Sequence, residues 1–185
     1  ARKKGVPLLP TPVDLQIGIT LCEGLHHLHG LKAADGRALK LVHREVGTDA
    51  VLLGYDGQVK LTDFLLGPSR AAVKSEMGVL KGKFPYFSPE QARGEVDLDR
   101  RSDVFAVGAV LYHLVCGRRP FEGELIDALP RMLKGDFFAP RSIHKALPAD
   151  VEAAIVKALA PTRDSRFGSA NDLEAALKAA MDPAF

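Results

Sequence analysis

The sequence has only two cysteines among its 185 residues, Cys22 and Cys116, and they lie far apart in apolar segments. This scarcity excludes the disulfide framework of small secreted domains and predicts reduced thiols in the core of an intracellular protein. An excess of one charge is also missing, because 25 Lys and Arg residues nearly balance 23 Asp and Glu residues. The positive charges are scattered along the chain, so we expect no nucleic-acid partner.

Long hydrophobic runs are absent as well. The longest apolar stretch, residues 104–116, is too short to cross a bilayer and favours a buried helix. The chain begins at Ala1 without a signal-peptide pattern, which is typical of a fragment or a trimmed product. We therefore expect a cytoplasmic location and no contact with a membrane.

What remains is the composition of a globular domain. Hydrophobic residues make up 46% of the chain and charged residues 26%, a balance that argues against disorder. The length is sufficient for a sizeable core and corresponds to one or at most two domains. We find no internal repeat and no low-complexity tract.

Helical periodicity covers most of the sequence. A helix is predicted from Thr11, which would cap it, through Pro12 and the capping-box acid Asp14 to Gly30. Later periodicity predicts further helices, over residues 103–117, 151–159 and 169–180. Two short strands around an Asp-Gly turn, within residues 51–61, predict a β-hairpin. The predicted fold class is mainly α with this small hairpin.

Five motifs occur in the order found in a protein kinase. Residues 42–50 (VHREVGTDA), 60–65 (KLTDFL) and 86–90 (YFSPE) resemble the catalytic loop, the metal-binding motif and the end of the activation segment. Residues 102–108 (SDVFAVG) resemble the start of the buried central helix, and residues 163–166 (RDSR) resemble the late arginine segment. The chain is most similar to bacterial kinases of the eukaryotic Ser/Thr type.

The resemblance implies the helical C-terminal lobe of that fold, over residues 11–181. This lobe contains a catalytic-loop region, 42–53, and an activation-segment-like region, 63–90. Residues 1–10 are expected to be a flexible lead-in and residues 182–185 a tail. The ATP-binding N-terminal lobe is expected to be absent from this chain, since no two of its 17 glycines stand two residues apart to form a phosphate-covering loop.

Four positions depart from the kinase motifs. Where the family has the Asp that accepts the substrate proton, this chain has Glu45, which is one methylene longer. Gly47 replaces a polar residue, Ala50 replaces the metal-holding Asn, and Leu65 replaces a glycine. Asp63 alone survives as a vestigial metal ligand. Because kinase chemistry is positioning plus electrostatic stabilisation, these losses predict a catalytically inactive domain without cofactor or metal.

Three hypotheses for function follow from this comparison. The first is a pseudokinase, which is not an enzyme and acts as a protein-binding or regulatory scaffold in intracellular signalling. The second is an atypical active Ser/Thr phosphotransferase whose ATP-binding lobe lies upstream or is supplied by a partner. The third is a plain structural module. Stabilisation by nucleotide would separate the second hypothesis from the other two.

Other family positions carry a structural role in the resemblance, namely His43, Arg44, Phe64, Glu90, Asp103 and Arg166. His43 and Phe64 are expected to stack. Asp103 is either a simple helix cap or the buried anchor of the catalytic-loop backbone, and the resemblance favours the anchor. Glu90 and Arg166 are expected to pair in the interior.

Three histidines at the end of the first predicted helix, His26, His27 and His29, raise the alternative of a metal site with Glu23. Their helical neighbours favour packing on the surface and in the core instead. We therefore expect no metal at this position.

A group of apolar side chains falls where the N-terminal lobe of the family would sit, and it comprises Leu52, Leu53, Phe64, Leu65 and Leu66. Soluble proteins rarely leave large apolar patches open to water. We therefore expect a protein partner or a homodimer to cover this face.

Overall fold

The computed structural model describes residues 9–64 and 84–181. Its α-helices are α1 (Thr11–His29), α2 (Pro89–Ala92), α3 (Arg101–Cys116), α4 (Leu125–Lys134), α5 (Pro140–Ile143), α6 (Ala149–Ala158) and α7 (Ala170–Ala180). Between them lie the strands β1 (Val51–Leu53) and β2 (Val59–Leu61) and the 3-10 turns η1 (Thr48–Ala50), η3 (Phe84–Tyr86) and η4 (Arg163–Ser165). The predicted fold class, mainly α with one small hairpin, is confirmed.

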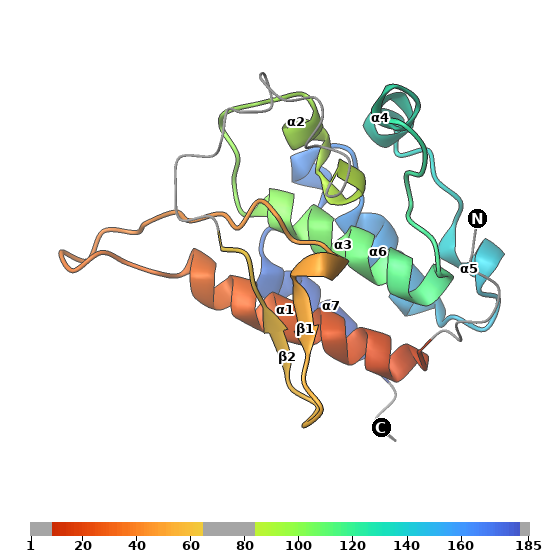
Figure 1. Ribbon diagram of the computed structural model, residues 1–185, viewed down its shortest axis with the longest axis horizontal. Helices are drawn as coiled ribbons and strands as arrows, with labels where there is room; N and C mark the ends of the chain where they lie inside the picture. Colours follow the sequence, from red (N-terminus) through yellow and green to blue (C-terminus); the bar gives the residue numbers. More distant parts are fainter. Residues whose placement is uncertain (1–8, 65–83, 182–185) are drawn as a thin grey trace.

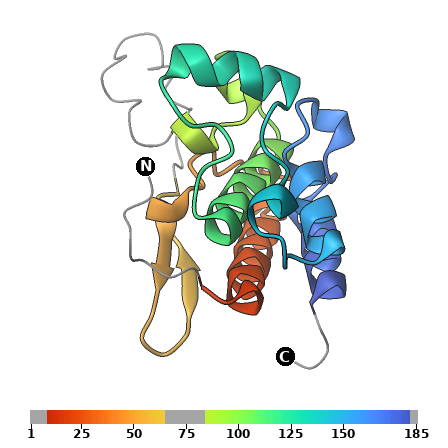
Figure 2. The same ribbon diagram turned by 90° about the vertical axis from the view of Figure 1, so that its right-hand side faces the viewer.

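The core is built around α3, which lies at the centre of the molecule (Figures 1 and 2). Every residue from Ser102 to Tyr112 is buried, as expected for a helix that is apolar almost all round. Helix α1 runs beside α3, and α6 and α7 pack around the same pair. The buried central helix predicted over this segment is therefore present.

Two glycines let neighbouring helices approach α3 closely. A Cβ at Gly18 of α1 would lie 2.6 Å from a methyl carbon of Leu111, and a Cβ at Gly108 would lie 2.7 Å from the Cβ of Ala158. Both distances are shorter than real Cβ contacts, so a larger residue at either crossing would force the neighbouring group to shift. The sequence therefore sets how tightly α1 and α6 close on the core.

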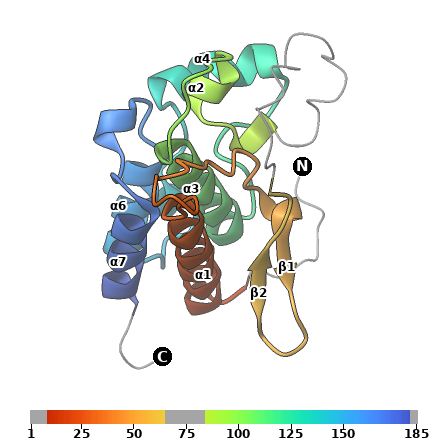
Figure 3. The same ribbon diagram turned by 90° about the vertical axis from the view of Figure 1, so that its left-hand side faces the viewer.

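The hairpin forms where the sequence predicts it. Strands β1 and β2 pair in antiparallel fashion with Val51 opposite Leu61 and Leu53 opposite Val59. Gly57 closes the turn at a φ of +82°, a conformation that costs glycine little. The hairpin flanks α1 on one side and α7 lies on the other (Figure 3). Residues 42–64, which include the hairpin, thus lie along the flank of the helical core.

Helix α4 is not predicted from the sequence. Pro130 lies inside it, and proline removes a backbone donor and disfavours a helix interior, so the local sequence argues against a helix here. The buried side chains of Ala128 and Met132 hold the helix to the rest of the fold. Tertiary packing therefore outweighs the local signal here.

The start of α1 differs from its prediction. Pro10, not Thr11, precedes the first helical residue, and no side chain caps this end. Asp14 does not act as a capping-box acid either, because its side chain is buried and neither carboxylate oxygen has a hydrogen-bond partner. Burial raises the pKa of Asp14 to about 7. By contrast, Ser169 caps α7 by accepting from the backbone N–H of Asp172, as predicted.

Replacing Asp14 with asparagine is expected to stabilise the protein above pH 7 by about 2–4 kcal/mol. The folded state holds a proton on Asp14 that the unfolded chain releases near pH 4, so the stability of the natural protein falls as the pH rises from about 4 to about 7. Thermal unfolding of Asp14→Asn at pH 4.5 and 8 measures this difference, with the exposed Asp97→Asn as control. An equal effect at both pH values would contradict a raised pKa.

Several predicted regions lie outside the described residues. These are residues 1–8 of the expected lead-in, the tail 182–185, and residues 65–83 of the activation-segment-like region, which include Leu65 and Leu66. Within the ranges that are described, no helix is long and apolar enough to cross a membrane.

Candidate functional site

The candidate catalytic loop, residues 42–53, is held by one buried carboxylate. Asp103, in the first turn of α3, accepts the backbone N–H of His43 at Oδ2 and that of Arg44 at Oδ1, both over 2.8 Å. It thus makes the contacts of an anchor rather than those of a simple helix cap, since its oxygens point to a loop 59 or 60 residues away in the chain. This carboxylate ties the loop to the most buried helix of the fold.

His29 contributes a third hydrogen bond to Asp103. Its Nε2 donates to Oδ2 over 2.8 Å, and the imidazole is almost fully buried, whereas His26 and His27 are exposed. No group of three or more His, Cys, Asp or Glu side chains that could hold a metal ion occurs in residues 9–64 and 84–181. His29, at the end of α1, therefore helps to hold Asp103, the residue that anchors the loop. Helical periodicity alone does not predict this role.

Replacing Asp103 with asparagine is expected to lower the free energy of unfolding by about 2–4 kcal/mol, because an amide N–H₂ would face buried N–H donors in place of an oxygen. The amides of His43 and Arg44 should exchange with solvent much faster in the variant. Hydrogen exchange by NMR measures both amides, with Asp127→Asn on the exposed side of α4 as control. Unchanged protection of the two amides would mean that Asp103 does not order the loop.

His43 connects the loop to the residues that precede Asp63. Its Nδ1 accepts the backbone N–H of Glu45 over 3.3 Å, so Nε2 carries the proton and donates to the carbonyl of Thr62 over 2.9 Å. The ring of Phe64 lies edge-on to the imidazole with the centroids 4.7 Å apart. The loop and the segment after β2 are thereby joined through the side chain of His43.

Asp63 adopts an unusual backbone conformation. Its φ is +63°, in the left-handed region that non-glycine residues seldom occupy. The preceding residue is fixed, because both the N–H and the hydroxyl of Thr62 donate to the carbonyl of Ala50. Such conformations persist where surrounding contacts hold them, and they concentrate at functional sites. The Asp63 side chain is thereby kept at the surface, next to the candidate catalytic loop.

Three of the four positions that depart from the family motifs lie together on this loop, and the fourth, Leu65, lies outside the described residues. Glu45 is half-buried, Gly47 is buried, and Ala50 is fully buried. A Cβ at Gly47 would lie 2.7 Å from Asp49 Oδ1 and 3.1 Å from the ring of Tyr86, so the space of a side chain is already filled. Within this group, Glu45 is the residue that brings a carboxylate where the family has its proton acceptor.

A second clamp on the loop comes from α2. The side chain of Gln91 donates to the carbonyl of Arg44 over 2.7 Å, and its oxygen accepts from Ser88 in a capping box. Arg44 has a φ of +71°, so this bond helps to hold a second left-handed residue in place. The end of the activation-segment-like region is in this way bonded directly to the candidate catalytic loop.

The expected pair of Glu90 and Arg166 is present and fully buried. The guanidinium donates to both carboxylate oxygens over 2.7 and 2.8 Å, and Ser102 donates to the same carboxylate over 2.7 Å. The remaining N–H groups of Arg166 bond to the backbone carbonyls of Ala160, Arg101 and Pro161. Burial alone would raise the pKa of Glu90, but Arg166 outweighs it and lowers that pKa to about 2.

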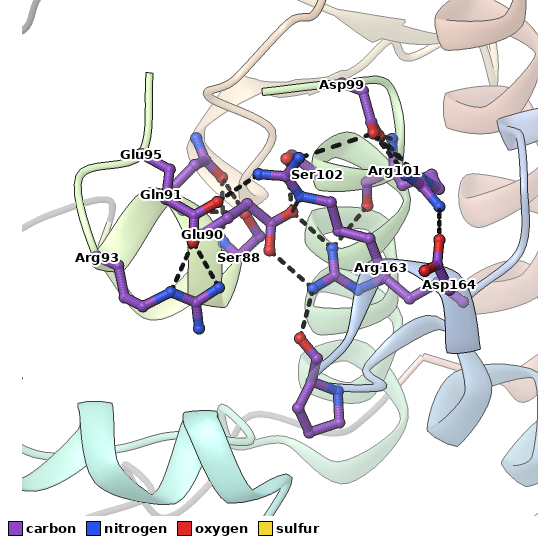
Figure 4. A network of polar contacts seen from close by, with 12 residues as sticks. Ser88, Glu90, Gln91, Arg93, Glu95, Asp99, Arg101, Ser102, Arg163 and Asp164 are labelled. Atoms are coloured by element: carbon purple, nitrogen blue, oxygen red, sulfur yellow. Dashed lines mark hydrogen bonds and ion pairs between the residues drawn. The ribbon is translucent and has the colours of Figure 1, made fainter. Parts of the chain in front are cut away.

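Around this pair lies a wider set of ion pairs between α2, α3 and η4 (Figure 4). Arg163 bonds to Glu95 over 2.6 Å, and Arg101 bonds to Asp99 and to Asp164. Most of these charges are partly open to solvent, so each contributes little on its own. Together they fix α2, and with it the clamp on the loop, against the late part of the chain.

The apolar face is exposed over its described part. The side chains of Leu52, Leu53 and Phe64 are 54%, 58% and 42% exposed. The two leucines also line an open hollow of about 580 Å³ over the hairpin. Large exposed apolar patches on soluble proteins often mark interaction sites.

The chain is similar in sequence to several named protein kinases. The chain is 37% identical over 172 residues to "Tyrosine-protein kinase MasK" of Myxococcus xanthus, which covers 92% of this chain and 26% of the relative. It is 32% identical to "Serine/threonine-protein kinase PrkC" of Bacillus subtilis, over 77% of this chain and 22% of the relative. It is 34% identical to "Serine/threonine-protein kinase PknB" of Mycobacterium tuberculosis, over 74% and 22%. The chain therefore spans about a quarter of the length of these curated relatives.

A solved structure has the same fold. The crystal structure of Rad53 1-466 in complex with AMP-PNP superposes with a TM-score of 0.69 at 19% identity, over 90% of this chain and 40% of that one. Such a low identity supports the architecture alone. The predicted kinase-like C-terminal-lobe fold is confirmed.

The prediction that the chain is not an enzyme is wrong in light of these relatives. All three are named protein kinases, which points to phosphotransferase activity. The prediction gave decisive weight to Glu45, Gly47, Ala50 and Leu65. Phosphoryl transfer in this family uses one carboxylate near the substrate hydroxyl and another near the metal ion, and carboxylates remain at positions 45 and 63.

The match to a family model completes the assignment. The model described as "Protein kinase domain" covers residues 14–174, from the first turn of α1 to the last helix. This range includes the anchored loop, Asp63 and the Glu90–Arg166 pair. The chain belongs to the protein kinase domain family.

Proposed function

We propose that this chain is the substrate-binding lobe of an active protein kinase, which transfers phosphate to a Ser or Thr hydroxyl. Its ATP-binding lobe would come from an upstream segment or from a partner. The observation that carries the proposal is the anchored loop, in which Asp103 holds the two N–H groups that precede Glu45. The names of the three relatives support the same reaction class.

Glu45 is the residue we assign to accept the proton of the substrate hydroxyl. Its carboxylate follows directly after the anchored residues, and its backbone N–H is bonded to His43. Because Glu is one methylene longer than Asp, its oxygens reach a different point, and a displacement of about 1 Å costs on the order of 100-fold in rate. A slow kinase is therefore expected.

Asp63 is the residue we assign to hold a magnesium ion with the nucleotide. Mg²⁺ is often bound by one or two protein carboxylates together with phosphates and water, so a single carboxylate fits one ion. Ala50 has no ligand atom, so a second ion has no side chain to hold it at that position. A bound Mg²⁺ would neutralise charge on the phosphates. Thr62 and His43 keep the Asp63 backbone in the conformation that presents its side chain.

We propose that the exposed apolar face binds another protein surface, which is either the ATP-binding lobe or a second copy of the chain. Its support is the exposure of Leu52, Leu53 and Phe64. Replacing Leu53 with aspartate should weaken that association at least tenfold, since a charge would have to be buried. Sedimentation of the natural chain and of Leu53→Asp, with the exposed Val96→Asp as control, measures the effect. A chain that stays monomeric and binds no lobe would contradict it.

A cytoplasmic location also belongs to the proposal, because a kinase needs ATP. The free, buried thiols of Cys22 and Cys116 are compatible with a reducing compartment. No nucleic-acid or membrane partner is proposed.

The reaction is tested with labelled ATP, Mg²⁺ and a general protein substrate. The polypeptide used must carry this chain together with an ATP-binding lobe. Transfer of label followed by phosphoamino-acid analysis should give phosphoserine or phosphothreonine. Phosphotyrosine alone would keep the reaction class but overturn the assigned acceptor, and no transfer would overturn the proposed function.

A further inference from the structure

A cationic cluster lies beside the candidate catalytic loop. The hydroxyl of Tyr86, in η3, is 2.8 Å from the hydroxyl of Thr48 and 2.7 Å from Nδ1 of His113. The guanidinium of Arg119 lies over the Tyr86 ring, 5.6 Å from its centre. We name these four residues the Tyr86 cluster. It joins the loop, η3 and the end of α3 in one group.

The Tyr86 cluster lies directly beside Gly47 of the candidate catalytic loop. The edge of the Tyr86 ring fills the space that a Cβ at Gly47 would need, at 3.1 and 3.5 Å. Arg119 covers the same ring. Its positive charge therefore borders a loop that carries the acidic residues Glu45 and Asp49 together with one cation, Arg44.

Arg119 is a half-buried cation within the described residues, 9–64 and 84–181. It makes no ion pair there, and its contact is with the aromatic ring. Its neighbour Arg118, by contrast, pairs with Glu122 over 2.8 Å and lies over Phe138. A guanidinium that lies over a ring still has N–H groups free to donate, and these suit bidentate binding of a carboxylate or a phosphate.

The positive charge of Arg119 affects the pKa of His113 within the Tyr86 cluster. Burial, and after it Arg119, lowers the pKa of His113, while Glu122 acts in the opposite direction without cancelling the shift. His113 is therefore neutral at physiological pH and serves as a hydrogen-bond partner of Tyr86. The side chain of Arg119 is half-buried, so its orientation is restrained while its edge stays accessible.

We propose that Arg119 binds an anionic side chain of the peptide substrate, close to the hydroxyl that is phosphorylated. This inference rests on the proposed function, because it assigns a substrate class to the same loop. The preferred substrate is a peptide with Asp, Glu or a phosphorylated residue near its acceptor. The Thr48–Tyr86–His113 hydrogen bonds hold the ring on which the cation is placed.

The test uses fluorescent peptides with a central serine, flanked at each of three positions on either side by Glu, phosphoserine, Ala or Arg. Binding is measured by anisotropy with the 185-residue chain, so no phosphoryl transfer is needed. Glu and phosphoserine peptides should bind about tenfold more tightly than Ala peptides at one preferred position. Preference for phosphoserine alone would identify a phosphate as the anion, and equal preference would identify charge itself.

Variants separate Arg119 from general electrostatics. Arg119→Glu should abolish the preference and reverse it toward Arg peptides, Arg119→Lys should keep part of it, and Arg118→Gln should leave it unchanged. Circular dichroism and melting temperature confirm that each variant is folded. A natural chain without charge preference, or a preference that survives Arg119→Glu, would overturn the inference.

A parallel transfer assay distinguishes the two proposals. Phosphorylation that is indifferent to Arg119 would overturn this inference and leave the kinase function standing. Binding that depends on Arg119 without any transfer would overturn the kinase function and leave anion recognition standing.

Discussion

Arg166→Ala should lower the free energy of unfolding by about 3–5 kcal/mol. The guanidinium is fully buried, all its N–H groups are bonded, and its removal would leave the Glu90 carboxylate without its main partner. The Ser102 hydroxyl would remain as a donor to Glu90, and the Arg163 guanidinium would remain 3.7 Å away, but neither replaces the two short bonds that Arg166 donates to the buried carboxylate. The loss follows from the uncompensated charge that remains, and it is larger than the net contribution of the pair.

Urea unfolding of the natural chain and of Arg166→Ala measures this loss. Arg93→Ala is the matched control, because Arg93 pairs with Glu95 at the surface, where such a pair contributes about 0–1 kcal/mol. An unchanged midpoint for Arg166→Ala would show that the pair does not hold α2 to the late part of the chain.

The same pair predicts a dependence of stability on pH. The pKa of Glu90 is lowered to about 2 in the folded state, below its ordinary value of 4.5. Its contribution is therefore complete above about pH 4.5 and is lost as the pH falls toward 2. Arg166→Ala should remove this loss of stability in acid. The free energies of unfolding of the variant and of the natural chain, measured against pH, should therefore converge at low pH.

Some features could be predicted because they depend on residues close in sequence or on a motif. The hairpin of β1 and β2 follows from an Asp-Gly turn between apolar residues, and the α7 cap follows from Ser169 and Asp172. The Glu90–Arg166 pair spans 76 residues and was accessible only through the family resemblance. Spacing alone does not report which distant charges meet.

Other features depend on the three-dimensional surroundings. His29 is one of three histidines at the end of α1, and only its hydrogen bond to Asp103 in the folded protein distinguishes it from the other two. Asp14 has the sequence pattern of a capping acid, yet packing buries it without a partner. The Tyr86 cluster joins residues 48, 86, 113 and 119, and no local pattern connects them.

The prediction of an inactive domain has a related weakness. It compared single residues with a motif and treated Glu45 as a loss. The backbone of this loop is nevertheless anchored by Asp103 and clamped by Gln91, so a carboxylate is still held at the position. Whether one extra methylene prevents proton transfer is a question of geometry, and residue identity does not answer it.

Glu45→Gln is expected to reduce the rate of phosphoryl transfer by about 10²–10⁴-fold, because an amide does not accept a proton from the substrate hydroxyl. Asp63→Asn should reduce it at least as strongly, since the magnesium ligand would lose its charge. Glu45→Asp should raise the rate above that of the natural protein, because the shorter side chain restores the reach found in the family. The exposed Glu124→Gln, at the residue before α4, serves as a control for general effects of a lost carboxylate.

The initial rate of label transfer from ATP to a protein substrate tests the central claim most directly. It is measured for the natural protein and for Glu45→Gln, each with an ATP-binding lobe and with its folding verified by melting temperature. The account predicts measurable transfer by the natural protein and its near-complete loss in Glu45→Gln. Transfer that continues unchanged in Glu45→Gln, or natural protein that transfers no phosphate, would contradict it.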